Sequence, residues 1–173
     1  MSQVTETPMK KISLDKVVLN MGLGKSGDAI SIAKVALEQI SGKKPSTRNA
    51  KEAHRDWGVR KGEPIGVAVT IRGDDATALL KRLLESKGNT VNGKSFDNFG
   101  NFSFGINEHI DIPGVKYDPQ IGILGLGISI TLTRPGYGIR TRSKHKARVG
   151  KSHVIKSQEA KDYLSKEFGV TVT

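Results

Sequence analysis

The sequence contains no cysteine, and this absence excludes disulfide bonds, cysteine-based zinc sites and thiol catalysis. Its four histidines are scattered along the chain and form no local metal motif, so we expect neither a metal ion nor a cofactor. No apolar run approaches the length of a membrane span, and residues 1–11 lack the apolar core of a signal peptide. These absences fit a reducing cytoplasm, where we expect the protein to act without a membrane partner.

Carboxylates are also missing from one long segment, and much of the net charge of the chain is concentrated there. Residues 134–156 contain eight lysines and arginines and no acidic residue, while residues 43–62 contain seven against Glu52 and Asp56. Together these two segments carry more net charge than the +11 of the whole chain. Charge at this density repels itself unless a polyanion neutralises it, and nucleic acid is the commonest such partner. A solubilising surface usually mixes both signs, so we expect nucleic-acid binding.

The length of 173 residues suffices for a single domain with a buried core. We expect a flexible N-terminal tail at 1–10 and two basic loop extensions at 43–62 and 134–156. Apolar residues at helical spacing predict helices at Asp28–Ser41, 74–87 and Ser157–Phe168, with Asp28 and Asp74 as N-caps. Runs rich in β-branched or alternating residues predict strands at 11–21, 64–72, 102–110 and 123–133, and a short edge strand at 170–172.

Alternation along the predicted strands separates an apolar face of the sheet from a polar one. The polar face is expected to carry Lys16, Asn20, Thr70, Arg72, Ser129, Thr131 and Thr133. Its short hydrogen-bonding groups, two cations and few aromatics suit phosphate and ribose contact better than base stacking, although ordinary half-buried sheets also have a solvated polar face. We therefore predict an α+β fold, with a mainly antiparallel sheet that has helices packed on one face and the other face open for RNA.

Residues 22–27 (GLGKSG) match the G-x-G-x-x-G pattern of dinucleotide-binding turns. Such a site also needs a second parallel strand that ends in an acidic residue, but here the basic segment at 43–62 follows the helix. We interpret 22–27 as a tight turn between a strand and a helix. Glu108, His109 and Asp111 suggest acid–base chemistry, but no nucleophile or oxyanion donor is visible near them, so we expect no enzyme activity.

Two further clusters have structural and functional interpretations. Gly122, Gly125 and Gly127 favour a bulge or the close approach of another backbone. The phenylalanines at 96, 99, 102 and 104 could stack on bases, but Phe102 and Phe104 share a strand face, which favours core packing for those two.

Four stretches resemble the large-subunit ribosomal protein five family, which binds 5S ribosomal RNA (rRNA). They are 16–24 (KVVLNMGLG), 40–45 (ISGKKP), 59–73 (VRKGEPIGVAVTIRG) and 95–112 (SFDNFGNFSFGINEHIDI). Their order is that of the family, and they span most of the chain. The Arg134-Pro135-Gly136 turn, the basic run after it and the lack of a long N-terminal helix resemble the archaeal and eukaryotic branch. The resemblance implies a structural component of the large ribosomal subunit without catalytic activity.

The resemblance also implies which residues bind 5S rRNA. The positions of this chain that match the family's 5S-binding motifs are Asn20, Lys43, Thr70 and Arg72. Lys16 joins them because it shares the polar face. The family often has glutamine where this chain has Lys43, so a base or sugar contact there is expected to become a phosphate contact.

Each basic segment has its own implied partner. The loop from about 50 to 62 resembles the one that reaches the elbow of the peptidyl-site (P-site) tRNA, through Arg55, Trp57, Arg60 and Lys61. Trp57 is expected either to stack or to brace this loop. Additional contacts to 23S-type large-subunit rRNA are expected from Arg134, Arg140, Arg142, Lys144, Lys146, Arg148 and Lys151. The region near 107–117 and the C-terminal part are expected to face the small-subunit head, because the family forms an intersubunit bridge to a head protein there. The other expected partners are neighbouring proteins of the central protuberance.

Two alternatives stay open at this point. A free-standing RNA-binding or chaperone-type protein outside the ribosome would need the same charge and the same polar face, and sedimentation in a sucrose gradient would distinguish it. A nucleotide-binding enzyme that used 22–27 would bind a nucleotide as an isolated chain.

Overall fold

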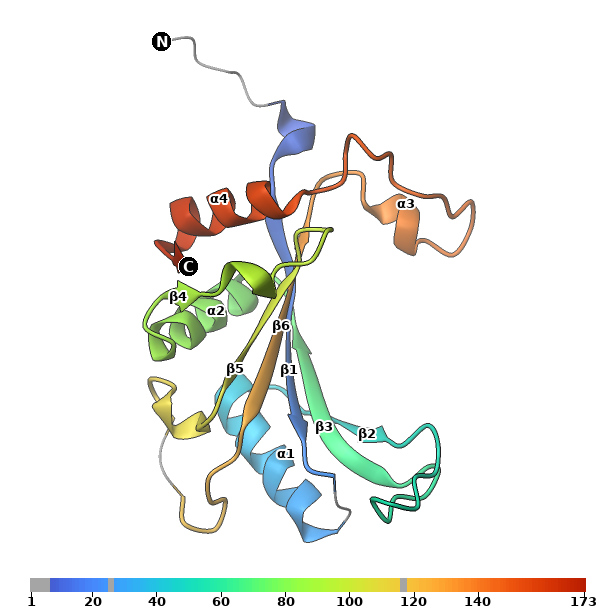
Figure 1. Cartoon of the computed structure of the whole chain (residues 1–173), viewed down its shortest axis with the longest axis vertical. Helices are drawn as coiled ribbons and strands as arrows, with labels where there is room; N and C mark the ends of the chain where they lie inside the picture. Colours follow the sequence, from blue (N-terminus) through green and yellow to red (C-terminus); the bar gives the residue numbers. More distant parts are fainter. Residues whose placement is uncertain (1–6, 25–26, 116–117) are drawn as a thin grey trace.

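A five-stranded sheet runs along the long axis of the molecule (Figure 1). The computed structural model describes residues 7–24, 27–115 and 118–173. The strand order is β2-β3-β1-β6-β5, and all four neighbouring pairs are antiparallel. These strands are β1 (Ser13–Gly22), β2 (Ser46–Asn49), β3 (Pro64–Ile71), β5 (Phe102–Ile106) and β6 (Leu126–Thr133).

Helices pack on one face of this sheet because that face carries the apolar half of the strand alternation. The helices α1 (Asp28–Ser41), α2 (Asp74–Ser86) and α4 (Ser157–Phe168) share one core with inward strand residues such as Leu19, Val69 and Ile130. Each large aliphatic side chain buried there stabilises the fold by about 1.5–3 kcal/mol. The predicted α+β fold with a mainly antiparallel sheet is confirmed.

Shorter elements complete the chain. The helix α3 (Gly138–Thr141) and the 3₁₀ helices η1 (Pro8–Lys10), η2 (Gly93–Ser95) and η3 (His109–Asp111) lie in the connections. The strands β4 (Thr90–Val91) and β7 (Thr171–Val172) form a separate two-stranded parallel sheet, so the predicted strand at 170–172 does not extend the main sheet. Within the described residues, no helix combines the length and the apolar character that a membrane crossing requires.

The helix caps and two strand ends differ from the predictions. Gly27 and Gly73 occupy the N-cap positions, whereas Asp28 and Asp74 are the first helical residues and cap nothing. Their carboxylates still favour the helix dipole from the first turn. The strand predicted at 102–110 ends at Ile106 and the one predicted at 123–133 begins at Leu126, because a 3₁₀ turn and an irregular loop occupy the intervening residues.

The first basic segment contains a strand that the sequence did not predict. β2 pairs with the edge of β3, with Ser46 opposite Ala68 and Thr47 opposite Val67. An edge strand exposed to solvent needs no apolar alternation, and a polar edge also resists aggregation, so the usual strand signal is missing here. In Figure 1 the segment that follows β2 extends to the lower right, whereas α3 and its neighbouring loops extend to the upper right. The two basic segments therefore lie at opposite ends of the sheet.

The N-terminal tail predicted at 1–10 is described only in part. Residues 1–6 lie outside the described residues. Pro8–Lys10 form η1 instead of an irregular tail, and the Lys10 carbonyl accepts a hydrogen bond from Arg134 Nε at 3.0 Å.

Candidate nucleic-acid interface

The side of the sheet that faces away from the helices, termed the open face, is polar and crosses four strands. Register places Val18 of β1 opposite Thr70 of β3 and Ser129 of β6, and Ser129 opposite Ser103 of β5. Thr70, Ser103 and Ser129 are exposed, and their hydroxyl groups can donate or accept hydrogen bonds. This row suits contact with phosphate and ribose oxygens, as the alternation predicted.

The next row of the open face is nearly bare around Asn20. Asn20 lies opposite Ala68 on one side and Gly127 on the other, and Gly127 lies opposite Gly105. A methyl group is therefore the largest side chain beside Asn20 in this row, and a flat backbone surface leads from it to the β5 edge. We call Asn20, Gly127 and Gly105 the shelf. An RNA sugar–phosphate chain can approach the shelf closely, because no neighbouring side chain in this row stands in its way.

The structure brings four of the five predicted 5S-binding residues to this face. Lys16, Asn20 and Thr70 belong to β1 and β3, and Arg72 directly follows β3. Lys43 lies beside them, in the connection between α1 and β2. Asn20, Lys43, Thr70 and Arg72 are exposed and Lys16 is half-buried.

Two of these cations already have carboxylate partners. Arg72 Nη1 donates to Asp15 Oδ1, and Lys43 Nζ lies 2.8 Å from Asp75 Oδ2. Both pairs are substantially exposed, so each stabilises the fold by no more than about 1 kcal/mol. Asp15 holds Arg72 at the open face, whereas Asp75, in the first turn of α2, holds Lys43 toward the helix side of the sheet. A phosphate can replace either carboxylate at small cost.

Asp15 reaches Arg72 because β1 contains a β-bulge. Leu14 pairs with Leu132 and Lys16 with Thr131, so Asp15 is the extra residue. The sequence analysis did not identify Asp15. The spacing of Leu14 and Val17 could have indicated the bulge. Both side chains pack toward the core although they are three positions apart, whereas strict alternation requires an even spacing.

The hairpin of residues 50–63 extends the β2–β3 pair and carries the residues predicted to face tRNA. Ala50 and Glu63 close its base, and His54 and Val59 exchange two backbone hydrogen bonds near its tip. Trp57 is 74% exposed, with its ring centroid 4.9 Å from that of His54. Trp57 therefore contacts another residue of the hairpin and still exposes most of its ring, a geometry that suits both predicted roles, bracing and stacking. Arg55, Arg60 and Lys61 are exposed beside it.

The second basic segment, residues 134–156, forms an arm with a buried base. Arg134 is only 6% exposed, and its guanidinium donates to the Lys10 carbonyl, to the His153 carbonyl and to Glu159 Oε1, the last at 3.0 Å. Burial and these three acceptors occupy the guanidinium of Arg134, so the structure does not present it to rRNA as the sequence predicted. Arg134 instead joins the arm to η1 and α4.

Glu159 completes this base from the first turn of α4. Burial by itself would raise the pKa of Glu159, but the Lys156 backbone N–H, which donates to Oε2 at 2.9 Å, and the Arg134 guanidinium together lower that pKa below its ordinary value. Tyr137 adds a second anchor, since its hydroxyl accepts from the Ile155 N–H at 2.8 Å and donates to the His153 carbonyl. The arm therefore leaves the sheet from an ordered base.

The other cations of the arm are exposed to solvent. The six other predicted rRNA contacts are all exposed: Arg140, Arg142, Lys144, Lys146, Arg148 and Lys151. None of them has a salt bridge to a described carboxylate, so these cations are available to an external polyanion.

The glycine turn at 22–27 does not form a nucleotide site in the part that the structure describes. The N–H groups of Leu23 and Gly24 both donate to the Ile65 carbonyl, at 3.0 and 3.1 Å, so neither is free for a phosphate. After α1 the chain enters the antiparallel edge strand β2 and not a parallel strand. Lys25 and Ser26 lie outside the described residues. The interpretation as a turn between a strand and a helix agrees with these bonds.

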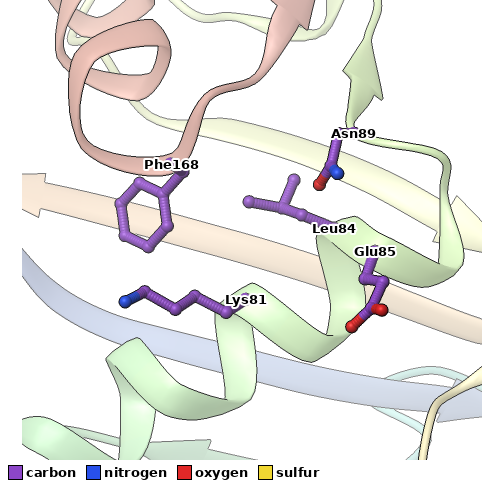
Figure 2. A pocket seen from close by; sticks show the side chains of 5 residues that line it. All are labelled: Lys81, Leu84, Glu85, Asn89 and Phe168. Atoms are coloured by element: carbon purple, nitrogen blue, oxygen red, sulfur yellow. The ribbon is translucent and has the colours of Figure 1, made fainter.

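A pocket of about 240 Å³ lies between α2 and the end of α4, with Phe168 beside Lys81 and Leu84 (Figure 2). It mixes one cation with Glu85, so it gives no electrostatic preference for an anion. Among the described residues, no group of three or more histidines and carboxylates could hold a metal ion.

The region predicted to face the small subunit, at 107–117, is described except for residues 116–117. His109 is 1% exposed, and its Nδ1 accepts the Leu124 N–H at 3.3 Å while its backbone N–H donates to the Leu124 carbonyl. His109 therefore ties η3 to the loop before β6. Ile123, in that loop, is 60% exposed.

Comparison with known proteins gives a consistent result over nearly the whole chain. The family model for ribosomal protein L5 matches residues 7–60, and the model for the C-terminus of the same ribosomal protein family matches residues 64–170. Large ribosomal subunit protein uL5 of Nitrosopumilus maritimus is 86% identical over 99% of both chains. The uL5 proteins of Cenarchaeum symbiosum and Pyrobaculum aerophilum are 69% and 45% identical, over 95% of this chain and 97% and 92% of theirs.

Proposed function

This chain belongs to the ribosomal protein L5 family, archaeal type, and from that premise we propose that its open face binds 5S rRNA in the central protuberance of the ribosome. As a member of the family it is a structural constituent of the large ribosomal subunit in the cytoplasm, not an enzyme. Its partners are ribosomal RNA and other ribosomal proteins.

The observation that carries the 5S proposal is the shelf, which shares the open face with the exposed hydroxyl groups of Thr70 and Ser129 and with the replaceable Arg72–Asp15 ion pair. Asn20 can hydrogen-bond a ribose or base edge, while Gly127 and Gly105 allow the RNA backbone to lie against the sheet. Arg72, farther along the open face, and Lys43, in the connection between α1 and β2, exchange their carboxylates for phosphates. A hydrogen bond to a charged group contributes about 1.5–3 kcal/mol, which exceeds the value of either exposed ion pair.

The hairpin is proposed to contact the P-site tRNA. It projects from the end of the sheet opposite to the arm (Figure 1) and presents Trp57 with Arg55, Arg60 and Lys61 around it. An exposed aromatic ring among cations can stack on an unpaired base or sugar while the cations neutralise phosphates. The hairpin therefore has the chemistry for a tRNA contact that is independent of the 5S site.

The arm and the loop at 107–125 complete the proposal. The six exposed cations of the arm contact large-subunit rRNA of the 23S type, and the loop with Ile123 helps form the bridge to a protein of the small-subunit head. Neighbouring proteins of the central protuberance are the remaining partners.

Footprinting on 5S rRNA tests the proposal. The full chain, bound to 5S rRNA from archaeal large subunits, should protect one contiguous region of the RNA from hydroxyl radicals. The variant Asn20→Ala should lose part of that protection at the same protein concentration. Equal protection by the wild type and by the triple variant Asn20→Ala, Thr70→Ala, Arg72→Ala would contradict the use of the open face.

A further inference from the structure

A groove of about 580 Å³ lies between the arm and the loop before β5. Its apolar lining includes Phe99 from that loop, Leu132 from the end of β6, and Tyr137 and Val149 from the arm. The volume is in the range of pockets that hold a small molecule or a single nucleotide. Four of the arm cations that are proposed to contact rRNA line this groove, but its apolar lining has no role in that contact so far.

The loop presents Phe99 in a fixed position. One oxygen of the Asp97 carboxylate accepts the Phe99 N–H at 2.9 Å and the Asn101 N–H at 2.7 Å. Gly100, at φ +75°, packs so closely on Ile155 that an added Cβ would lie 2.5 Å from Ile155 Cγ2. Phe99 is nevertheless 57% exposed. A loop whose backbone is already ordered at a groove loses less conformational freedom when a ligand binds, which favours affinity.

The charge around the groove restricts what can occupy it. Arg140, Lys146, Arg148 and Lys151 line it, and no carboxylate does. An occupant must therefore combine a flat apolar group with several negative charges. A nucleotide chain with one base turned out of its stack has this combination, because its phosphates repeat along the chain on both sides of the base.

We propose that this groove receives an unstacked base of single-stranded RNA, which stacks on Phe99 while the four cations hold the flanking phosphates. The inference rests on the proposed function, since it specifies how the arm contacts rRNA. It also divides the contact into a base-dependent part at Phe99 and a charge-dependent part at the cations, which can be measured separately. An acidic protein segment with an aromatic side chain is the competing occupant.

The test compares two probes of equal charge, a 12-nucleotide oligoadenylate and an abasic RNA of the same length, in a fluorescence anisotropy titration. All proteins are full-length chains in a Trp57→Leu background, which removes the stacking site of the hairpin. The parent chain should bind oligoadenylate about tenfold more tightly than the abasic probe, in line with base stacking on one aromatic ring. Phe99→Leu should remove most of this difference and change binding of the abasic probe by less than about twofold.

Three variants control for other effects. Phe99→Tyr keeps an aromatic ring and should keep the preference. Ala147→Phe should fill the groove with a side chain from the arm and abolish the preference for oligoadenylate without altering Phe99. It therefore replaces Phe99→Leu as the test of the groove if Phe99→Leu does not fold. Lys146→Gln should weaken binding of both probes by the same factor and reduce its dependence on salt.

The inference is overturned if Phe99→Leu and Ala147→Phe, both folded by circular dichroism, retain the full preference for oligoadenylate. It is also overturned if a glutamate-rich peptide with one phenylalanine binds more tightly than oligoadenylate and loses that affinity in Phe99→Leu. Affinity for 5S rRNA, measured on the same proteins, separates the two proposals. A parent chain that does not bind 5S rRNA contradicts the proposed function. If Phe99→Leu loses the preference for oligoadenylate but binds 5S rRNA as the parent chain does, the base site in the groove is supported as separate from the 5S site.

Discussion

Asp15 and Asp75 each pair with a cation that is predicted to bind 5S rRNA, and these pairs show how a single residue prepares a surface for RNA. Arg72 and Lys43 are long flexible side chains that would lose rotamer freedom on binding RNA. A carboxylate that already restricts them reduces this loss. Because both pairs are exposed, the carboxylate is worth less than a phosphate contact, and exchange favours the RNA.

The Arg72→Ala variant should bind 5S rRNA more weakly by about 1–3 kcal/mol, because it removes one charge-assisted contact. The variant Asp15→Asn should bind at least as tightly as the wild type, since it removes a competitor of the phosphate. Filter-binding titrations at moderate salt measure both affinities. Lys87→Ala is the matched control, because it removes one exposed positive charge at the end of α2. Equal affinities for Arg72→Ala and Lys87→Ala would refute the role of Arg72.

The Glu159→Gln variant should lower the free energy of unfolding by about 1 kcal/mol at neutral pH, because the buried Arg134 guanidinium loses its charged partner. The pKa of Glu159 is lowered from its ordinary value of 4.5 in the folded chain, so this contribution is fully present above that value. It is lost as the pH falls through the lowered pKa. The difference between wild type and variant should therefore shrink below about pH 4.5.

Urea unfolding followed by circular dichroism at pH 7 and at pH 3.5 measures this difference. Glu38→Gln, at an exposed position of α1, controls for the general effect of removing a carboxylate. A stability difference between wild type and Glu159→Gln that is the same at both pH values would show that the ion pair does not contribute.

Strands and hairpins determine the shape of the RNA surface. The shelf exists because β1, β6 and β5 place Asn20, Gly127 and Gly105 in one row. Glycine inside a strand usually weakens a sheet, so two glycines in one row are unfavourable for folding alone. Their position beside Asn20 is explained by the space that they leave on the open face.

The Gly105→Thr variant should fold as well as the wild type and bind 5S rRNA roughly tenfold more weakly or worse, since loss of one charged contact already costs about 1.5 kcal/mol. The fold should tolerate it because an added Cβ meets nothing closer than the Leu126 carbonyl oxygen at 3.8 Å, and threonine favours strands. Thermal unfolding and filter binding measure the two effects. Ser103→Thr, on the same face and strand, adds one methyl group and should bind almost normally; a similar loss in both variants would argue against the shelf.

Deletion of residues 53–61 should leave 5S rRNA affinity unchanged and weaken P-site tRNA binding to reconstituted large subunits. The Ala50–Glu63 pair at the base of the hairpin is retained, and the three residues left between them are enough for a short hairpin loop. Trp57→Leu, which removes the exposed indole and nothing else, should give part of the same tRNA defect. A loss of 5S rRNA binding in the deletion variant would contradict the division between the two surfaces.

At the scale of the whole molecule, the sheet separates its RNA surfaces. The hairpin and the arm lie at opposite ends of the sheet, with the open face between them (Figure 1). Positive charge at both ends gives the chain a long-range attraction to RNA that depends on salt, while the specific contacts lie on a face with little net charge. One small domain can thus contact several RNA segments without changing its fold.

The triple variant Lys144→Gln, Lys146→Gln, Lys151→Gln should reduce the salt dependence of binding to large-subunit rRNA. The slope of log K against log salt should become shallower by about 2–3, because fewer counterions are released. The slope for 5S rRNA should stay unchanged, since the arm is not part of the open face. Titrations at four salt concentrations give both slopes, and a change in both would show that the arm also binds 5S rRNA.

The sequence by itself determined the kind of partner and the polar side of the sheet. Charge density and strand alternation are local properties, so the cations at 134–156 and the outward position of Thr70 follow from neighbouring residues alone. Apolar spacing in Ser157–Phe168 likewise gave the bounds of α4 correctly, because capping and packing signals agree there.

Only the tertiary structure decided which residues meet across the sheet and which cation is buried. The shelf beside Asn20, the β-bulge at Asp15 and the edge strand β2 depend on register between strands that are far apart in sequence. Arg134 looks like any other cation of the arm in the sequence, yet its burial depends on Lys10 and Glu159, which lie 124 and 25 positions away. Such long-range contacts leave no local pattern, because the energy that fixes them comes from the packed fold as a whole.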